Sequence, residues 1–215
     1  GSNVDVPNQV GSDVGWQQVS AGPRYTCAVR DGGELWCWGL NNSGQLGNGE
    51  TGLEVVDLER VDGSWTRVAT GGGHTCALDD QGALHCWGAN TQGQCGQDPA
   101  TDVVLTPAQV GDDTDWDRLA LGDGVSCATK TDGTLWCWGT RESGELGDGI
   151  IDRDEGSDIP IQVGADTDWT SISALAGHVC GVRATGGAWC WGENFSGQQG
   201  NDTVFISGTP RQVVQ

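Results

Sequence analysis

Cysteine is the residue type whose spacing in this chain could do chemistry, because eight of the nine cysteines form pairs whose members are ten residues apart. A Gly-containing turn lies midway between the two members of each pair, so each pair is expected to face across a β-hairpin. Directly opposed residues of antiparallel strands have Cα atoms about 4.5–5.5 Å apart, within reach of a disulfide. The predicted disulfides are Cys27–Cys37, Cys76–Cys86, Cys127–Cys137 and Cys180–Cys190. The alternative is four pairs of small buried thiols in a reduced protein.

The remaining cysteine, Cys95, lies in a Gly-Gln-Cys-Gly segment whose equivalents elsewhere contain Leu46 and Leu146. It is interpreted as a partly buried replacement for leucine with a free thiol. A nucleophile or an intermolecular bridge is the alternative, but no histidine or acidic partner can be assigned to this thiol. Zinc sites need paired Cys-x-x-Cys spacing, which the sequence lacks.

Other patterns for catalysis or cofactor binding are missing from the sequence. There is no Ser-His-Asp order with a nucleophile elbow, no phosphate loop and no dinucleotide fingerprint. The segment from Asp152 begins like a calcium loop, but Gly156 falls at its fifth place and the later Glu is lacking. We therefore expect a protein that is not an enzyme and holds no cofactor, with calcium in an acidic loop as the remaining alternative.

The net charge of −20 and the pI near 4.1 bear on possible partners. Sequence-independent binding to nucleic acid needs a basic surface, and an anionic membrane repels an acidic protein. No apolar run approaches the about 20 residues that span a bilayer. Basic proteins or cations remain as partners.

The elements that position the cysteines come from a fourfold repeat. Four tryptophans, 49, 51 and 53 residues apart, open the copies: Trp16, Trp65, Trp116 and Trp169. A period near 50 suits a propeller blade of four antiparallel strands. Residues 1–2 read as a cloning remnant, and residues 3–215 as one repeat domain: an extra outer strand (3–15) and repeats at 16–64, 65–115, 116–168 and 169–215.

Each repeat is predicted to contain a strand from the opening tryptophan, the hairpin, and a short closing strand. The closing strands are expected at 58–61, 107–110, 160–163 and 210–213, three of them starting with Pro. The segment Pro7–Gly11 reads as a surplus fifth copy of this strand. The array is therefore predicted to be an arc cut from a larger propeller or a protomer that associates with itself, with a closed four-blade ring as the alternative.

The motifs Gly73-x-Thr75-Cys76-Ala77, Leu84-x-Cys86-Trp87-Gly88-x-Asn90 and Gly44-Gln45-Leu46-Gly47 resemble the repeat of the regulator of chromosome condensation family. The resemblance covers nearly the whole chain and implies a β-propeller, usually of seven blades. The cysteine pairs resemble the exported bacterial branch of such repeats. Family members act as a nucleotide exchange factor on chromatin, as β-lactamase inhibitors and as interaction modules, and only the fold and protein binding are carried over here.

Histidines and tryptophans supply the candidate binding residues. The tryptophans recur in register, which favours packing between blades over stacking on sugars. Family geometry places the junction before each first cysteine near the propeller axis, which gives a candidate binding face: Arg24, Tyr25, His74, Val125 and His178. The expected function is a non-catalytic module outside the cytoplasm (extracellular, cell-surface or periplasmic) that binds an unknown protein through its loops. The alternatives are a carbohydrate or cell-surface binding module and, less favoured, an enzyme or exchange factor.

Overall fold

The computed structural model describes residue 7 and residues 9–214. The predicted remnant at residues 1–2 lies outside them. Sixteen strands, and no helix, are found in the described residues. They form four antiparallel sheets, each of four strands in chain order, which we call blades 1 to 4. The predicted all-β repeat architecture is thus confirmed.

The blades have these bounds. Blade 1 consists of β1 (Trp16–Ala21), β2 (Tyr25–Arg30), β3 (Glu34–Asn41) and β4 (Gly52–Val61). Blade 2 consists of β5 (Trp65–Thr70), β6 (His74–Asp79), β7 (Leu84–Ala89) and β8 (Val103–Gln109). Blade 3 consists of β9 (Trp116–Leu121), β10 (Val125–Lys130), β11 (Leu135–Arg141) and β12 (Asp152–Gln162). Blade 4 consists of β13 (Trp169–Leu175), β14 (His178–Arg183), β15 (Ala188–Gly192) and β16 (Ser207–Gln212).

The central hairpin of each blade sets its register. The two cysteines of each predicted pair are direct cross-strand neighbours and are joined as disulfides with Cα atoms 4.1 Å apart. The glycine after Cys-Trp then takes a positive φ, as at Gly39 (+110°). A Cβ there would lie 2.6 Å from the Arg24 carbonyl oxygen. Only glycine permits this conformation and approach, and the ladder to the closing strand shifts register at the same point.

The closing strands start earlier than predicted. β4, β8, β12 and β16 begin at Gly52, Val103, Asp152 and Ser207, so Pro107, Pro160 and Pro210 lie inside strands instead of at their starts. These strands are tolerant of proline because each is the outermost of its blade and pairs on one side only.

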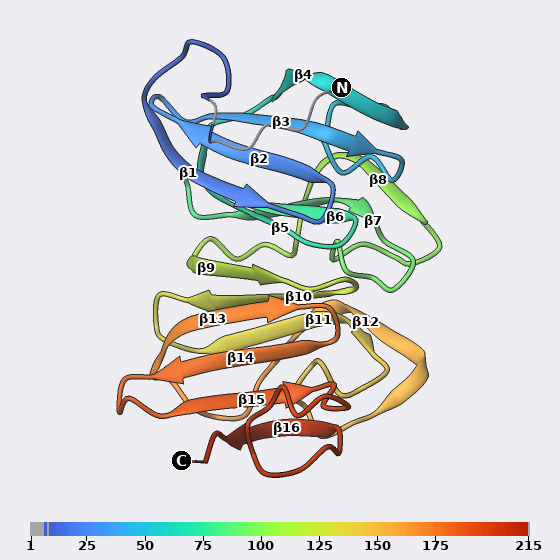
Figure 1. Ribbon diagram of the computed structural model, residues 1–215, viewed down its shortest axis with the longest axis vertical. Coiled ribbons are helices and arrows are strands. Elements are labelled where there is room, and N and C mark those ends of the chain that lie inside the picture. The colour runs from blue at the N-terminus through green and yellow to red at the C-terminus, as the bar shows by residue number, and fades with distance from the viewer. Residues whose placement is uncertain (1–6, 8, 215) are drawn as a thin grey trace.

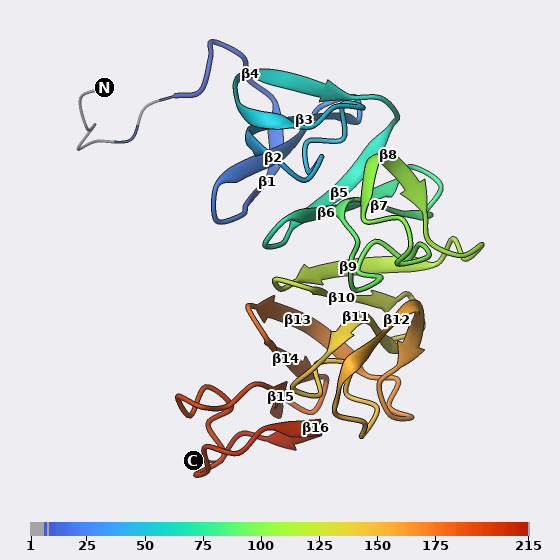
Figure 2. The same cartoon turned by 90° about the vertical axis from the view of Figure 1, so that its right-hand side faces the viewer.

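The blades form an open arc (Figures 1 and 2). Neighbouring blades pack through their inner strands: β5 contacts β1 and β2, β9 contacts β5 and β6, and β13 contacts β9 and β10. Blades 1 and 4 lie at opposite ends (Figure 2). Within the described part of the chain, each of these two therefore has one face that no other blade covers.

The predicted extra outer strand is not formed in its described part, since residues 9–15 belong to no strand. The third strand of every blade already pairs with the blade's own closing strand, so no sheet edge of that kind is open to the segment. Polar contacts hold it near the β2–β3 turn. Arg30 Nη1 donates to Asp13 Oδ2 at 2.7 Å, and the Asp31 amide donates to the Gly15 carbonyl at 2.9 Å.

Candidate functional site

A hydrogen bond from a tryptophan side chain recurs at each seam between neighbouring blades. In blades 2, 3 and 4, the tryptophan of the Cys-Trp-Gly motif donates its indole N–H to a backbone carbonyl of the preceding blade. The three bonds are Trp87 to Gln45 (3.0 Å), Trp138 to Gln94 (3.0 Å) and Trp191 to Glu145 (2.8 Å). All three indoles are fully buried. These tryptophans therefore pack between blades, as predicted.

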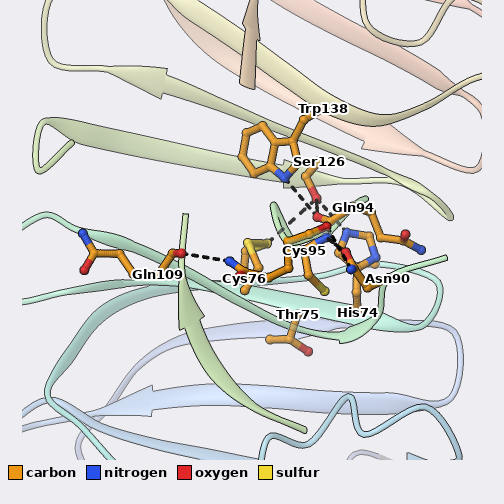
Figure 3. The surroundings of a disulfide bond; sticks show 12 residues. His74, Thr75, Cys76, Asn90, Gln94, Cys95, Gln109, Ser126 and Trp138 are labelled. Atoms are coloured by element: carbon orange, nitrogen blue, oxygen red, sulfur yellow. Dashed lines mark hydrogen bonds between the residues drawn. A yellow bond between two sulfur atoms is a disulfide. The ribbon is translucent and has the colours of Figure 1, made fainter. Parts of the chain in front are cut away.

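At two of the seams, a hydroxyl group donates to the same carbonyl as the indole. Thr75 Oγ1 donates to the Gln45 carbonyl at 2.8 Å, and Ser126 Oγ donates to the Gln94 carbonyl at 2.7 Å. Figure 3 shows Ser126 and Trp138 reaching from blade 3 to Gln94 and His74 of blade 2. The equivalent residue of blade 4 is Val179, which has no hydroxyl. The Glu145 carbonyl of the third seam thus has one donor, whereas the Gln45 and Gln94 carbonyls have two each.

Two residues of the predicted binding face are buried inside these seams. Tyr25 donates its hydroxyl to the His74 carbonyl and accepts a bond from the Gly71 amide at 3.1 Å. His74 Nε2 lies 2.8 Å from Ser126 Oγ. Because Ser126 gives its hydrogen to the Gln94 carbonyl, His74 is the donor through Nε2. Burial raises the pKa of Tyr25 and lowers the pKa of His74 to about 3, so both side chains are neutral.

The predicted face is therefore not a single surface. Val125 is fully buried, in the same apolar cluster as Val179. His178 is half-buried and Arg24 is exposed, but they lie on blades 4 and 1, at opposite ends of the arc (Figure 2). Of the five residues, only these two offer surface to a partner.

Cys95 is the only free cysteine in the structure, and it is buried. Its thiol donates to the Ala89 carbonyl at 3.2 Å, and its amide donates to Asn90 Oδ1 at 3.0 Å. Burial raises the pKa of the Cys95 thiol, which keeps it protonated and unreactive. Leu46 and Leu146, at the same place in their blades, are equally buried. The leucine-like position of Cys95 is thus a core position.

Three blades hold a basic side chain between two tryptophans, an arrangement we call the cation clamp. In blade 3 the Lys130 ammonium lies 4.9 Å from the Trp116 ring centre and 5.3 Å from that of Trp136. It also pairs with Asp113 at 2.7 Å and Asp115 at 3.0 Å. Arg30 in blade 1 and Arg183 in blade 4 repeat this geometry with their own tryptophans and aspartates. In each clamp, the cation between the two tryptophans is therefore a basic side chain of the same blade.

Blade 2 lacks this cation. Asp79 stands at the position of the basic residue, and His85 replaces the second tryptophan. Asp79 Oδ2 lies 3.1 Å from His85 Nε2, and the His85 ring meets Trp65 edge-on at 5.3 Å. Burial raises the pKa of Asp79, but hydrogen bonds from the Ala83 amide, His85 and the Gln81 amide outweigh it, so the pKa lies below its usual value. Asp79 is therefore negatively charged at the position where the other three blades carry a positively charged side chain.

A hollow of about 580 Å³ opens beside this inverted clamp. Its charged lining is Glu59, Asp62, Asp79 and Asp80, against one guanidinium, that of Arg60. Asp62 occupies the place of Asp13, Asp113 and Asp166, which bind the clamp cation in the other blades. The hollow thus keeps carboxylates that elsewhere hold a basic side chain. Sequence comparison of the repeats could have found it, because Asp79 and His85 each break a pattern that the other three copies share.

Among the described residues, no three histidine, cysteine or acidic side chains are grouped so that they could hold a metal ion. The segment that begins like a calcium loop lies at the start of strand β12, where its pairing with β11 is irregular between Asp152 and Ser157. No helix in the described residues is long and apolar enough to cross a membrane. Five tryptophans are half-buried (Trp16, Trp36, Trp38, Trp136 and Trp189) and the other six are buried.

Solved structures with this fold include three informative examples. Prp20p from Saccharomyces cerevisiae, studied for its binding to Gsp1p and histones, is 21% identical with a TM-score of 0.83, over 98% of this chain and 52% of that chain. Human WBSCR16 is 20% identical with a TM-score of 0.84, over 97% and 55%. The ectodomain of the Physcomitrella patens receptor kinase CR4 is 25% identical with a TM-score of 0.55, over 90% and 46%. The chain spans about half the length of these structures.

Two family models, both described as the regulator of chromosome condensation (RCC1) repeat, match the sequence. One matches residues 16–45 and 65–94, and the other matches residues 32–78 and 81–129. Together they extend from the first strand of blade 1 into the hairpin of blade 3, just over half of the chain. Blade 4 continues the same strand order, disulfide and seam bond. The chain therefore belongs to the regulator of chromosome condensation (RCC1) repeat family.

Proposed function

We propose that the chain is a non-catalytic protein-interaction module that binds a basic side chain of its partner in the hollow of blade 2. The observation that carries this proposal is the inverted cation clamp. Three blades fill the equivalent place with their own Arg or Lys, whereas blade 2 leaves the aspartates without one. A lysine or arginine from a partner protein is the group that matches those carboxylates.

The charge of the whole chain supports a basic partner. A net charge of −20 attracts a positively charged protein at long range and speeds its encounter. The family likeness supports protein binding in general, since the yeast relative is described as binding proteins. The loops that connect blades, including Asp62–Ser64 at the start of blade 2, form part of the proposed contact surface.

An oxidising compartment is the proposed setting. Four hairpin disulfides are typical of extracellular, cell-surface or periplasmic proteins and rare in the cytosol. A partner in that setting would be a secreted or surface protein with an exposed basic segment. Association of the chain with itself is compatible with this role, because the hollow lies between blades 1 and 2 and not on an end face.

The test is to fill the hollow with the chain's own cation. The double variant Asp79→Arg/His85→Trp rebuilds the clamp of the other blades. Binding of a short arginine-rich peptide is measured by calorimetry at about 150 mM salt, where long-range attraction is largely screened. We expect the wild type to bind and the double variant to lose at least tenfold in affinity.

The control is Asp154→Arg, an equal charge change at an exposed residue of β12. It is expected to retain nearly all of the affinity. Equal losses in the two variants would mean that only net charge attracts the peptide, and unchanged affinity in the double variant would exclude the hollow.

A further inference from the structure

The two ends of the arc expose the two halves of a blade seam. On blade 1, Thr26 and Trp38 are half-exposed, whereas their equivalents in the inner seams, such as Thr75 and Trp87, are fully buried. Those equivalents both donate to one carbonyl of the preceding blade. Within the described residues, blade 1 has no preceding blade, so it presents an indole N–H and a hydroxyl as a ready pair of donors.

Blade 4 presents the matching acceptor. Gln198 is the equivalent of Gln45, Gln94 and Glu145, whose carbonyls accept the seam bonds. Its turn is built in the same way, because Gln198 Oε1 accepts the Ser196 amide at 2.8 Å just as Gln45 Oε1 accepts the Ser43 amide at 2.9 Å. The inner acceptor residues are at most 4% exposed, while Gln198 is half-exposed. Its carbonyl is therefore positioned for donors from a further blade.

The side chains nearer the axis show the same match. Each inner seam pairs one residue with a complementary residue of the next blade: Tyr25 with Thr75, His74 with Ser126, and Val125 with Val179. The residues left over at the ends are His178 on blade 4 and Thr26 on blade 1. An imidazole facing a hydroxyl repeats the chemistry of the His74–Ser126 seam, so the two ends of this chain complement each other.

We propose that blade 4 of one copy docks against blade 1 of a second copy, with Trp38 and Thr26 donating to the Gln198 carbonyl and His178 facing Thr26. The contact is head to tail, so two copies make it twice and close a ring. The ring has eight blades, within the range of known propellers. This self-association is independent of peptide binding in the hollow.

Leu175 fits this larger ring. It is 65% exposed at the end of β13, where the other blades have Gly22, Gly71 and Gly122. A Cβ at Gly122 would lie 2.4 Å from the Ala176 carbonyl oxygen of the next blade, so the inner seams require glycine. In the proposed contact, Leu175 would keep the two innermost strands further apart than glycine does in the inner seams, which favours a smaller angle between the two blades. A ring of eight blades needs a smaller average rotation between neighbouring blades than one of seven, and Leu175 changes the seam between copies in that direction.

The test is the mass in solution of the whole chain, by sedimentation velocity at about 150 mM salt over a range of concentrations. The wild type is expected to approach twice 22.4 kDa. Trp38→Arg blocks the blade 1 end, and His178→Arg blocks the blade 4 end; each alone is expected to remain at 22.4 kDa. Circular dichroism and thermal melting check that both variants fold. Leu53→Ser, at a residue that is 84% exposed on outermost strand β4, is the control and should leave the dimer intact.

Mixing the two blocked variants separates this contact from others. Trp38→Arg keeps an intact blade 4 end, and His178→Arg keeps an intact blade 1 end. These two ends are complementary, so the mixture is expected to form a dimer through a single seam. A wild-type chain that stays monomeric at all concentrations would overturn the proposal. So would a dimer in either blocked variant alone, which would indicate a contact between two like ends, or a dimer lost only in Leu53→Ser.

Discussion

The unequal seams give a prediction that can be worked out from single atoms. Trp87→Phe and Trp191→Phe remove the same indole N–H from equally buried sites, with similar neighbouring rings (Trp65 at 5.8 Å and Trp169 at 6.0 Å). The loss of volume is therefore nearly the same in both. The carbonyls left behind differ: that of Gln45 keeps the Thr75 hydroxyl at 2.8 Å, whereas that of Glu145 loses the only donor the structure gives it.

An acceptor left without a partner in a buried site costs about 1–3 kcal/mol. We therefore expect Trp191→Phe to lower the free energy of unfolding by about 1–2 kcal/mol more than Trp87→Phe. In a chain of this size that is about 2–8 °C in Tm. Urea unfolding followed by tryptophan fluorescence, together with calorimetry, measures both quantities.

A rescue variant isolates the cause. Val179→Thr places in the third seam the hydroxyl that Thr75 supplies in the first. In the Trp191→Phe background it is expected to recover about 1 kcal/mol, because the Glu145 carbonyl regains a donor. Equal losses for the two phenylalanine variants, or no recovery with Val179→Thr, would refute the role assigned to these carbonyls.

Three further predictions follow from the disulfides, the buried histidine and the cation clamp. Under denaturing, non-reducing conditions one thiol, that of Cys95, should react, whereas nine reactive thiols would show a reduced protein. The double variant Cys76→Ala/Cys86→Ala should lower the free energy of unfolding in urea by about 2–3 kcal/mol. His74 has a folded pKa of about 3, below its unfolded value near 6.5, so the unfolded state takes up a proton first and stability falls as the pH drops below about 6.5. Between pH 7.5 and 5 this loss should be about 2 kcal/mol and should be absent in His74→Gln; an unchanged slope in that variant would contradict it. Lys130→Met should cost about 1–2 kcal/mol and lose part of its effect at high salt, whereas a cost within about 0.3 kcal/mol of zero would mean that the clamp contributes nothing.

Much of the blade could be predicted because its signals are local. Cysteines ten residues apart around a turn fix the register of the central hairpin, since only direct opposition brings both side chains to one face. The opening tryptophans fix the repeat. The starts of the closing strands are harder to predict, because their early residues are exposed, as Arg153–Gly156 of β12 are. Only pairing with the neighbouring strand makes them extended.

The candidate face could not be predicted from repeat equivalence alone. The sequence predicts Tyr25 and His74 to be surface residues, because equivalent positions of the repeats differ in chemistry there. Each of these side chains instead contacts a matching residue of the next blade: Tyr25 contacts Thr75, and His74 contacts Ser126. Comparing each repeat with its neighbour, shifted by one copy, would have revealed this pairing. The departures of Asp79 and His85 from the other three copies are visible in the sequence, but the hollow and its carboxylate lining are seen only in the structure.

The most direct test of the proposed function is a titration of the chain with the arginine-rich peptide, followed by NMR at the indole N–H and imidazole resonances. Binding in the hollow predicts saturable shifts at His85 and Trp65, while the clamp tryptophans Trp116 and Trp136 of blade 3 stay unchanged. Shifts of similar size in all blades, or saturable binding that leaves His85 and Trp65 unmoved, would contradict a basic side chain in blade 2.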